Sequence, residues 1–327
     1  MRLISRSDVE AHLPIGECIA LMRTTMAAAS RGETNQLLRQ FVAIPGAPGK
    51  MAMMPGTMDD PACFGIKLVC KYQRALGDPL GTHVGMVLLF DSAKGIPLAM
   101  VEGSALTAIR TAATSAMATD ILARRDARSL AMIGSGEQAA RHIDAMLAIR
   151  PIDTITIWSR TAERASAFAA ATALRTAVRT TAMSTAAEAI KGADIICTTT
   201  SADEPVLSGD DLEAGQHLTL VGSAIPSTAE VDAHAVRRSR FYVDSRPAAL
   251  AAAGELRRAI EAGMVDETHI IGEIGDVVDG RVAGRVSAHD ITIYKSLGIA
   301  AQDLAAAHLL WSKASNQLFG GMFDLLD

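Results

Sequence analysis

The sequence predicts an α/β protein that combines a doubly wound parallel sheet domain with a second, α+β domain. Three observations carry this prediction. The chain has 327 residues, which is about twice the usual length of one domain. Strand-like runs alternate with helical segments from Ser129 to Asp244. Before them, from Leu37 to Asp91, short apolar runs are separated by Gly, Pro and Asp, which is typical of an antiparallel sheet.

Composition excludes several classes of protein. Hydrophobic residues make up 49% of the chain and charged residues 20%, so bulk disorder is excluded. The net charge is −5 and no long basic run occurs, which argues against a nucleic-acid or membrane partner. The four cysteines lack CxxC spacing and the eight histidines are scattered, so we expect no disulfide framework and no metal site. Without a signal region or an apolar span, we expect a cytoplasmic protein.

The first part of the chain is expected to form a helix, a sheet and a second helix. The first helix runs from about Ser7 to Arg31, with Ser7 as its cap. The strands of the sheet are Phe41–Ile44, Met51–Met54, Gly65–Tyr72, His83–Phe90 and Pro97–Glu102. The alanine-rich stretch Ala105–Ala123 is apolar nearly all round and predicts a buried helix. A polar break at Asp126 and Arg128 marks the first domain boundary.

The second part alternates strands and helices, which predicts βαβ units and a parallel sheet covered on both faces. The predicted strands are Ser129–Ile133, Thr154–Trp158, Ile195–Thr198, Leu218–Val221 and Phe241–Asp244. The predicted helices are Glu137–Leu147, Ala162–Leu174 and Thr185–Lys191, with a last helix, Ser296–Lys313, near the end of the chain.

A glycine-rich turn, G-x-G-x-x-A, lies between the first of these strands and the helix after it. Gly134 would allow a tight turn, Gly136 would let the backbone approach a pyrophosphate, and Ala139 would let the helix pack closely. The free N–H groups of the helix would face the phosphates. A purely structural turn is the alternative, but the strand–turn–helix context favours a Rossmann-type dinucleotide site. Its candidate residues are Gly134, Ser135, Gly136, Glu137 and Gln138.

The end of the next strand indicates which nucleotide binds. NAD sites usually carry an acidic residue there, whereas this chain has Ser159, Arg160 and Thr161. Because Arg160 could pair with a 2′-phosphate, we favour NADP(H), with NAD(H) possible. Arg160 could otherwise be an exposed residue that starts a helix. Thr198 and Thr199 could line the cofactor channel, or serve only as strand residues.

Three basic residues lie in apolar surroundings in the first part of the chain. Arg110 falls within the predicted buried helix, Lys67 lies in an apolar strand, and Arg39 precedes another apolar run. A buried arginine requires a partner or an anionic ligand. The three could form a clamp for a substrate carboxylate, with Arg110 providing a bidentate fork. Each taken alone could instead be a snorkelling or salt-bridged side chain.

Several segments, in this order, resemble the ornithine cyclodeaminase/mu-crystallin family. They are Gly65-Ile66-Lys67, Val87 to Asp91, Leu106 to Ala113, Gly134 to Ala139, Trp158 to Thr161, Glu230-Val231-Asp232, and Tyr294 to Gly298 with Asp303. The resemblance implies a Rossmann domain, residues 125–295, inserted into a substrate-binding and dimerisation domain, residues 1–124 and 296–327. It also implies a homodimer, and hydride transfer between a nicotinamide and the α-carbon of an amino or imino acid.

By this resemblance, Arg39, Lys67 and Arg110 match the residues that hold the substrate carboxylate, with Lys67 close to the reacting nitrogen. Lys67 and Arg110 are therefore the catalytic candidates. Further cofactor-binding candidates are Val221, Gly222 and Ser223.

One departure from the family pattern bears on the reaction. Cyclodeaminases carry an aspartate at the position of Ala224, and an alanine cannot accept a proton. We therefore expect an NAD(P)H-dependent reductase of a small cyclic 2-imino acid, of the pyrroline-2-carboxylate or piperideine-2-carboxylate type. The alternatives are an ornithine cyclodeaminase, an alanine-dehydrogenase-like enzyme, and a non-catalytic NADPH-dependent binding protein.

Overall fold

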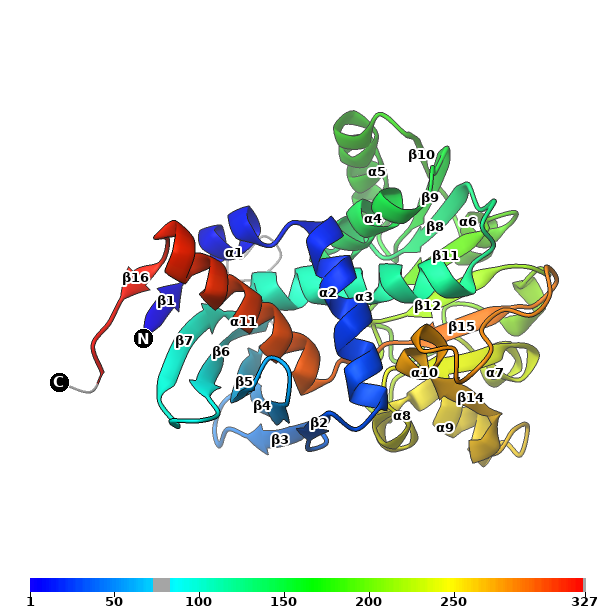
Figure 1. Cartoon of the computed structure of the whole chain (residues 1–327). Helices are drawn as coiled ribbons and strands as arrows, with labels where there is room; N and C mark the ends of the chain where they lie inside the picture. Colours follow the sequence, from blue (N-terminus) through cyan, green and yellow to red (C-terminus); the bar gives the residue numbers. More distant parts are fainter. Residues whose placement is uncertain (73–82, 326–327) are drawn as a thin grey trace. The chain divides into compact units, whose positions relative to one another are not determined.

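The computed structural model describes residues 1–72 and 83–325, and the chain divides into two compact units (Figure 1). Unit 1 comprises Met1–Thr111 and Gly298–Asp327, and unit 2 comprises Ala112–Leu297. The division falls inside helix α3 (Gly103–Leu122), so this buried, alanine-rich helix contributes to both units. Its position confirms the helix predicted for residues 105–123.

The sheet of unit 1 has the strand order β16-β1-β7-β6-β5-β4-β2, with β3 paired to β4. The strands are β1 (Arg2–Ile4), β2 (Thr34–Gln36), β3 (Gln40–Ala43), β4 (Lys50–Met58), β5 (Cys63–Lys71), β6 (His83–Asp91), β7 (Pro97–Glu102) and β16 (Gly321–Met322). Strands β3 to β7 pair antiparallel, as the sequence predicts. Strands β1, β2 and β16 were not predicted, because two or three residues are too few to show the alternation of apolar and polar residues.

The first predicted helix is wrong in its continuity and its cap. The segment forms two helices, α1 (Arg6–His12) and α2 (Ile15–Ser30), which are separated at Pro14. Proline has no amide hydrogen, and its ring disfavours helical backbone in the residue before it. The cap of α1 is Ser5, which forms a capping box with Asp8.

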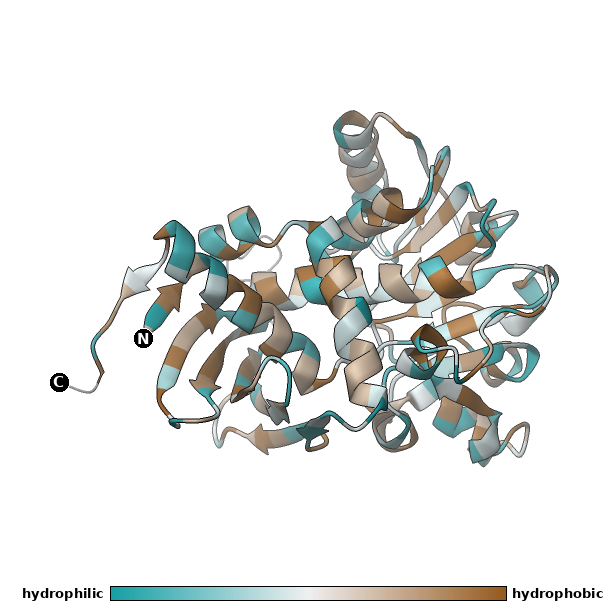
Figure 2. Cartoon of the chain, viewed as in Figure 1, coloured by the Kyte–Doolittle hydropathy of each residue, from teal (hydrophilic) through white to brown (hydrophobic). Residues whose placement is uncertain are grey.

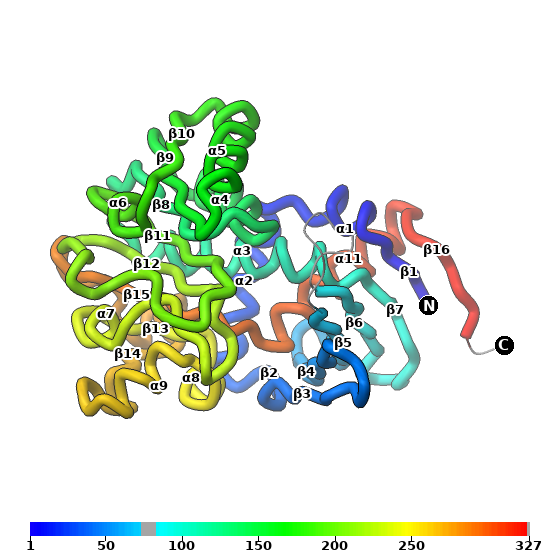
Figure 3. Tube along the Cα trace, turned by 180° about the vertical axis from the view of Figure 1, so that it is seen from behind, coloured from blue at the N-terminus to red at the C-terminus, as the bar shows by residue number. Residues whose placement is uncertain are grey.

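The last helix, α11 (Ala300–Gln317), begins four residues later than the sequence predicts. The reason is Gly298, whose φ of +80° is not helical. Helix α11 packs across strands of the unit 1 sheet, and β16, near the end of the described residues, pairs with β1 at the N-terminus (Figures 1 and 3). The returning C-terminal segment therefore completes the core of unit 1.

The sheet of unit 2 is entirely parallel, in the order β10-β9-β8-β11-β12-β15-β13-β14. Its strands are β8 (Ser129–Ile133), β9 (Thr154–Trp158), β10 (Arg179–Ala182), β11 (Ile195–Thr198), β12 (His217–Leu220), β13 (Arg240–Val243), β14 (Ile270–Glu273) and β15 (Thr292–Lys295). The predicted doubly wound sheet is confirmed. The strand order reverses between β8 and β11, and such a switch point is where sheets of this kind bind ligands.

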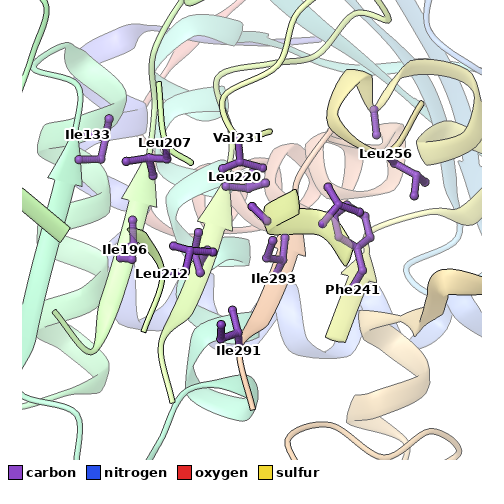
Figure 4. Packing of buried hydrophobic residues seen from close by; sticks show 14 of the residues in the cluster. Ile133, Ile196, Leu207, Leu212, Leu220, Val231, Phe241, Leu256, Ile291 and Ile293 are labelled. Atoms are coloured by element: carbon purple, nitrogen blue, oxygen red, sulfur yellow. The ribbon is translucent and has the colours of Figure 1, made fainter. Parts of the chain in front are cut away.

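Helices cover the unit 2 sheet and enclose its core. They are α4 (Glu137–Ile149), α5 (Ala162–Thr176), α6 (Ala186–Ile190), α7 (Ala233–Arg238), α8 (Arg246–Ala252), α9 (Gly254–Glu261) and α10 (Ile274–Val278). Hydrophobic residues line the inner strands, and Ile196, Leu220 and Phe241, from three different strands, belong to one continuous core (Figures 2 and 4). Among the helices of the described residues, none is both long and apolar enough to span a membrane.

Candidate active site

The glycine turn of unit 2 lies at the carboxyl end of β8, beside the switch point. Gly134 has a φ of +128°, and its N–H donates to the carbonyl of Trp158 at 2.8 Å. A Cβ at this position would lie 2.5 Å from Oγ1 of Thr199, which follows β11. Only glycine fits here, so the residue brings the two central strand ends into contact.

The second glycine of the turn has free space around its Cβ position, unlike the first. Gly136 precedes α4 with an ordinary extended backbone, and no atom lies within 4 Å of where its Cβ would be. Glu137 is also exposed, while Ser135 and Gln138 are half-buried. Ala139 is fully buried, which brings α4 close to the sheet. The open space and the helix N-terminus together suit a pyrophosphate of a dinucleotide.

The end of β9 presents one exposed cation. Arg160 is exposed, and no hydrogen bond or ion pair to it exists among the described residues. Its neighbour Ser159 donates through Oγ to the carbonyl of Thr161 at 3.0 Å, which shapes the turn into α5. Glu163 is the acidic residue in the first turn of α5. The arrangement can accept a phosphate group.

A buried glutamate, absent from the sequence-based candidates, organises the ends of β11 and β12. The carboxylate of Glu230 accepts hydrogen bonds from Oγ1 of Thr198 at 2.7 Å and from the N–H groups of Thr200 and Gly222, also at 2.7 Å. Glu230 and Thr198 are fully buried. The hydroxyl of Thr198 is thus committed to a structural bond. The sequence held a weak signal, because Glu230 lies between the apolar residues Ala229 and Val231, and a glutamate that is buried requires partners.

The loop after β12 contains the remaining cofactor candidates. Val221 and Gly222 are half-buried, whereas Ser223 is buried and donates through Oγ to the carbonyl of Thr228 at 2.5 Å. The carbonyl of Ser223 accepts from Nζ of Lys295 at 2.5 Å. Lys295 also pairs with Glu255 at 3.3 Å, and both side chains are fully buried. This ion pair anchors the loop that carries Ala224, so its backbone path is set by unit 2 itself.

A second cluster of functional side chains lies in unit 1. Nζ of Lys67, on β5, lies 3.1 Å from Oδ1 of Asp303, in the first turn of α11. Nε of Arg110, on α3, lies 2.9 Å from the same oxygen. Lys67 lies on the same face of β5 as the buried residues Cys63 and Gly65, which is the face that packs against α11. The structure therefore brings together two of the three predicted basic residues and joins them through a carboxylate.

The surroundings of Arg110 hold its guanidinium in place. NH1 donates to Oε1 of Gln302 at 2.5 Å. A Cβ on Gly298 would lie 2.9 Å from the same nitrogen, so the positive-φ glycine lets the backbone approach closely. Asp303 and Gln302 were missed as site residues. Two polar residues in the apolar run Ala300–Ala307 are the signal that could have found them, because such residues require partners when buried.

The electrostatics of this cluster are dominated by positive charge. Burial lowers the pKa of Lys67 to about 7, Asp303 counteracts this shift, and the charges of Arg110 and Arg39 add to it. Arg39 precedes β3, is half-buried, and has its Nε 3.4 Å from Sδ of Met54. The charges of Arg110 and Arg39 thus both act on Lys67 within unit 1. Such a cluster can bind a carboxylate and can exchange a proton near neutral pH.

A glycine turn at the switch point of a doubly wound sheet is typical of nucleotide-dependent oxidoreductases. The profile of the ornithine cyclodeaminase/mu-crystallin family matches residues 2–317, and the chain belongs to this family. A Delta(1)-pyrroline-2-carboxylate reductase of Bacillus cereus (strain ZK / E33L) is 35% identical over 315 residues, which cover 96% of this chain and 97% of that protein. The ketimine reductase mu-crystallin of Mus musculus is 32% identical over 317 residues, covering 96% and 97%.

A solved structure is similar over the same length. The Delta(1)-pyrroline-2-carboxylate reductase of Thermococcus litoralis, in complex with NADH and L-proline, has a TM-score of 0.95 and 31% identity. The match covers 99% of this chain and 100% of that one. The family inferred from the sequence motifs is thereby confirmed.

Proposed function

We propose that this protein is an NAD(P)H-dependent reductase that converts a small cyclic 2-imino acid, of the pyrroline-2-carboxylate or piperideine-2-carboxylate type, to the amino acid. The observation that carries the proposal is the buried cluster of Lys67, Arg110 and Asp303, in which two cations share one carboxylate oxygen. The names of the relatives, reductases of pyrroline-2-carboxylate and ketimines, support the same chemistry.

The substrate carboxylate would bind to the basic side chains that cluster in unit 1. Arg110 is held rigidly by Gln302 and Asp303, and a preorganised guanidinium loses little entropy when it binds a carboxylate. Arg39 would add a second cation. Lys67 would supply a proton to the imine nitrogen, because its pKa of about 7 allows both protonation states near neutral pH.

The nucleotide would bind to unit 2. The backbone at Gly136 and the N-terminus of α4 would hold the pyrophosphate. We favour NADP(H) over NAD(H), because Arg160 is exposed and could pair with a 2′-phosphate. When bound, the nicotinamide supplies the hydride for the imine carbon.

Cyclodeamination is less well supported. The loop between Gly222 and Thr228 carries Ala224, where cyclodeaminases have an aspartate. A methyl group can neither bind an amine nor accept a proton from water. Simple reduction needs no such group.

We also propose a homodimer formed through unit 1. Four large apolar side chains on β3 and the segment before it are exposed: Leu37, Leu38, Phe41 and Val42. Exposed apolar residues that gather on one edge strand are typical of a surface covered by a partner. Light scattering would give twice the chain mass, and Phe41→Lys with Val42→Lys would give the monomer.

The experiment that tests the activity is a spectrophotometric assay of NADPH and NADH oxidation with the two imino acids, beside NAD⁺ reduction with L-ornithine. Fast loss of reduced nucleotide with an imino acid and none with ornithine would support the proposal. Turnover of ornithine would contradict both the proposed reaction and the reasoning from Ala224.

A further inference from the structure

The cluster in unit 1 buries more positive charge than negative charge. The side chains of Lys67 and Arg110 are 4% and 3% exposed, and that of Asp303 is fully buried. Arg39 is half-buried and its charge also acts on Lys67. The charges of Lys71, Lys67 and Arg39 all act on His83, at the start of β6. Asp303 is thus the single acidic group that faces Lys67 from these elements of the described structure.

Asp303 is placed to control both cations. Its Oδ1 accepts from Nζ of Lys67 and Nε of Arg110. Its Oδ2 is buried and has no hydrogen-bond partner among the described residues. The carboxylate lies in the first turn of α11, where the helix dipole stabilises negative charge. Half of the acceptor capacity of this carboxylate therefore remains unused.

We propose that Asp303 is a positioning residue that keeps Lys67 protonatable beside Arg110, so that binding of a substrate carboxylate to this cluster is accompanied by uptake of about one proton at Lys67.

The argument is a balance of buried charge. The carboxylate of Asp303 offsets the charge of the Arg110 guanidinium. A proton on Lys67 then adds a further positive charge to a buried site, which is why burial lowers its pKa from 10.5 to about 7. An arriving carboxylate cancels that charge and raises the pKa again. The anion and the proton therefore bind together.

This coupling rests on the proposed function and deepens it. Reduction of a C=N bond requires a hydride at carbon and a proton at nitrogen. The Nζ–H bond of Lys67 would break as the N–H bond of the product forms, and the electron pair of that bond would stay on Nζ. A bound reduced nicotinamide would supply the hydride that reduces the imine and would itself be oxidised, and neutral Lys67 would regain its proton from solvent. Binding of the substrate carboxylate thus favours protonation of Lys67, and reduction of the same substrate then consumes that proton.

Calorimetry tests the coupling without turnover. The probe is pyrrole-2-carboxylate, a planar five-membered ring that carries a carboxylate and is not a substrate for imine reduction. Its binding heat is measured at about pH 8 in phosphate and in Tris, whose ionisation enthalpies differ, and the difference gives the number of protons taken up. We expect a value that approaches one for the wild type and falls toward zero at about pH 6, where Lys67 is already protonated.

Variants locate the proton and its counterion. Lys67→Met should bind without uptake at either pH. Asp303→Asn keeps an oxygen acceptor but loses the charge, so uptake at about pH 8 should fall to near zero and reappear at lower pH. Asp303→Glu should restore part of the proton uptake at about pH 8. Asp59→Asn, an exposed carboxylate elsewhere in unit 1, should behave as the wild type.

The pH profile of kcat/KM separates positioning from structural damage. In Asp303→Asn the alkaline limb should move to lower pH by about one to three units. A merely structural defect would lower the rate at every pH and leave the limb in place. Wild-type binding without proton uptake, no binding of the probe, or unchanged uptake in Asp303→Asn would each overturn the inference. Uptake without turnover of either imino acid would remove the proposed function and leave the coupling intact.

Discussion

The two candidate ligand-binding regions are built in different ways. In unit 2 the glycine turn, residues 134–138, is one contiguous segment whose binding groups are those of the backbone. In unit 1 the basic cluster consists of side chains from a strand and two helices, and Lys67 and Asp303 are 236 positions apart in the sequence. A backbone site tolerates most changes of side chain, whereas a cluster of buried charges depends on each of its members. Substitutions should therefore act very differently in the two units.

The largest effect is expected in unit 1, from Arg110→Ala. The change removes the charge that would hold the substrate carboxylate, and loss of one partner of a buried charge pair costs about 2–5 kcal/mol. We expect kcat/KM for the imino acid to fall by about 10²–10³-fold, with little change in the affinity for NADPH. Asp303 keeps Lys67 as a partner, so the variant should fold. An unchanged kcat/KM would contradict the carboxylate clamp.

Glu230→Gln tests whether unit 2 also depends on a buried charge. Its carboxylate accepts hydrogen bonds from Thr198, Thr200 and Gly222, and an amide would place N–H groups against one of these donors. A buried hydrogen bond to a charged group contributes about 1.5–3 kcal/mol, so we expect a loss of stability of that order in chemical denaturation. Asp203→Asn, which alters an exposed carboxylate of the same unit, is the control. Equal stability of the two variants would mean that the ends of β11 and β12 do not depend on the charge of Glu230.

The same contrast explains what the sequence could predict. The strands β8 and β9 and the turn at Gly134 could be predicted, because strand periodicity and the glycine spacing are local patterns. Asp303 and Glu230 could not be assigned roles, because their partners are far away in the sequence and only the fold brings them together. Strand β15 was missed for a related reason: Lys295 interrupts its apolar pattern, and only the fold supplies the buried partner Glu255.

Gly136→Ala tests whether the open turn receives a ligand. No atom lies near the added Cβ and the backbone φ of −97° suits alanine, so the fold should be unaffected. A methyl group that obstructs a pyrophosphate should weaken NADPH binding by roughly 10–100-fold, the cost of a modest steric conflict. The matched control is Gly16→Ala, on α2 of unit 1, which also has open space. Fluorescence titration with NADPH would measure both, and equal affinities would place the nucleotide elsewhere.

Arg160→Ala is expected to have the smallest effect. It tests whether the Arg160 side chain contributes to the choice between the two nucleotides. An exposed arginine that pairs with a 2′-phosphate is screened by solvent, so its loss should reduce the preference for NADPH over NADH by about tenfold. The affinity for NADH should hardly change, because NADH carries no 2′-phosphate. Arg179→Ala is the control, since this exposed arginine begins β10 at the amino end of the strands, whereas Arg160 follows the carboxyl end of the neighbouring β9. If the ratio of the two affinities stays the same in both variants, Arg160 does not select the nucleotide.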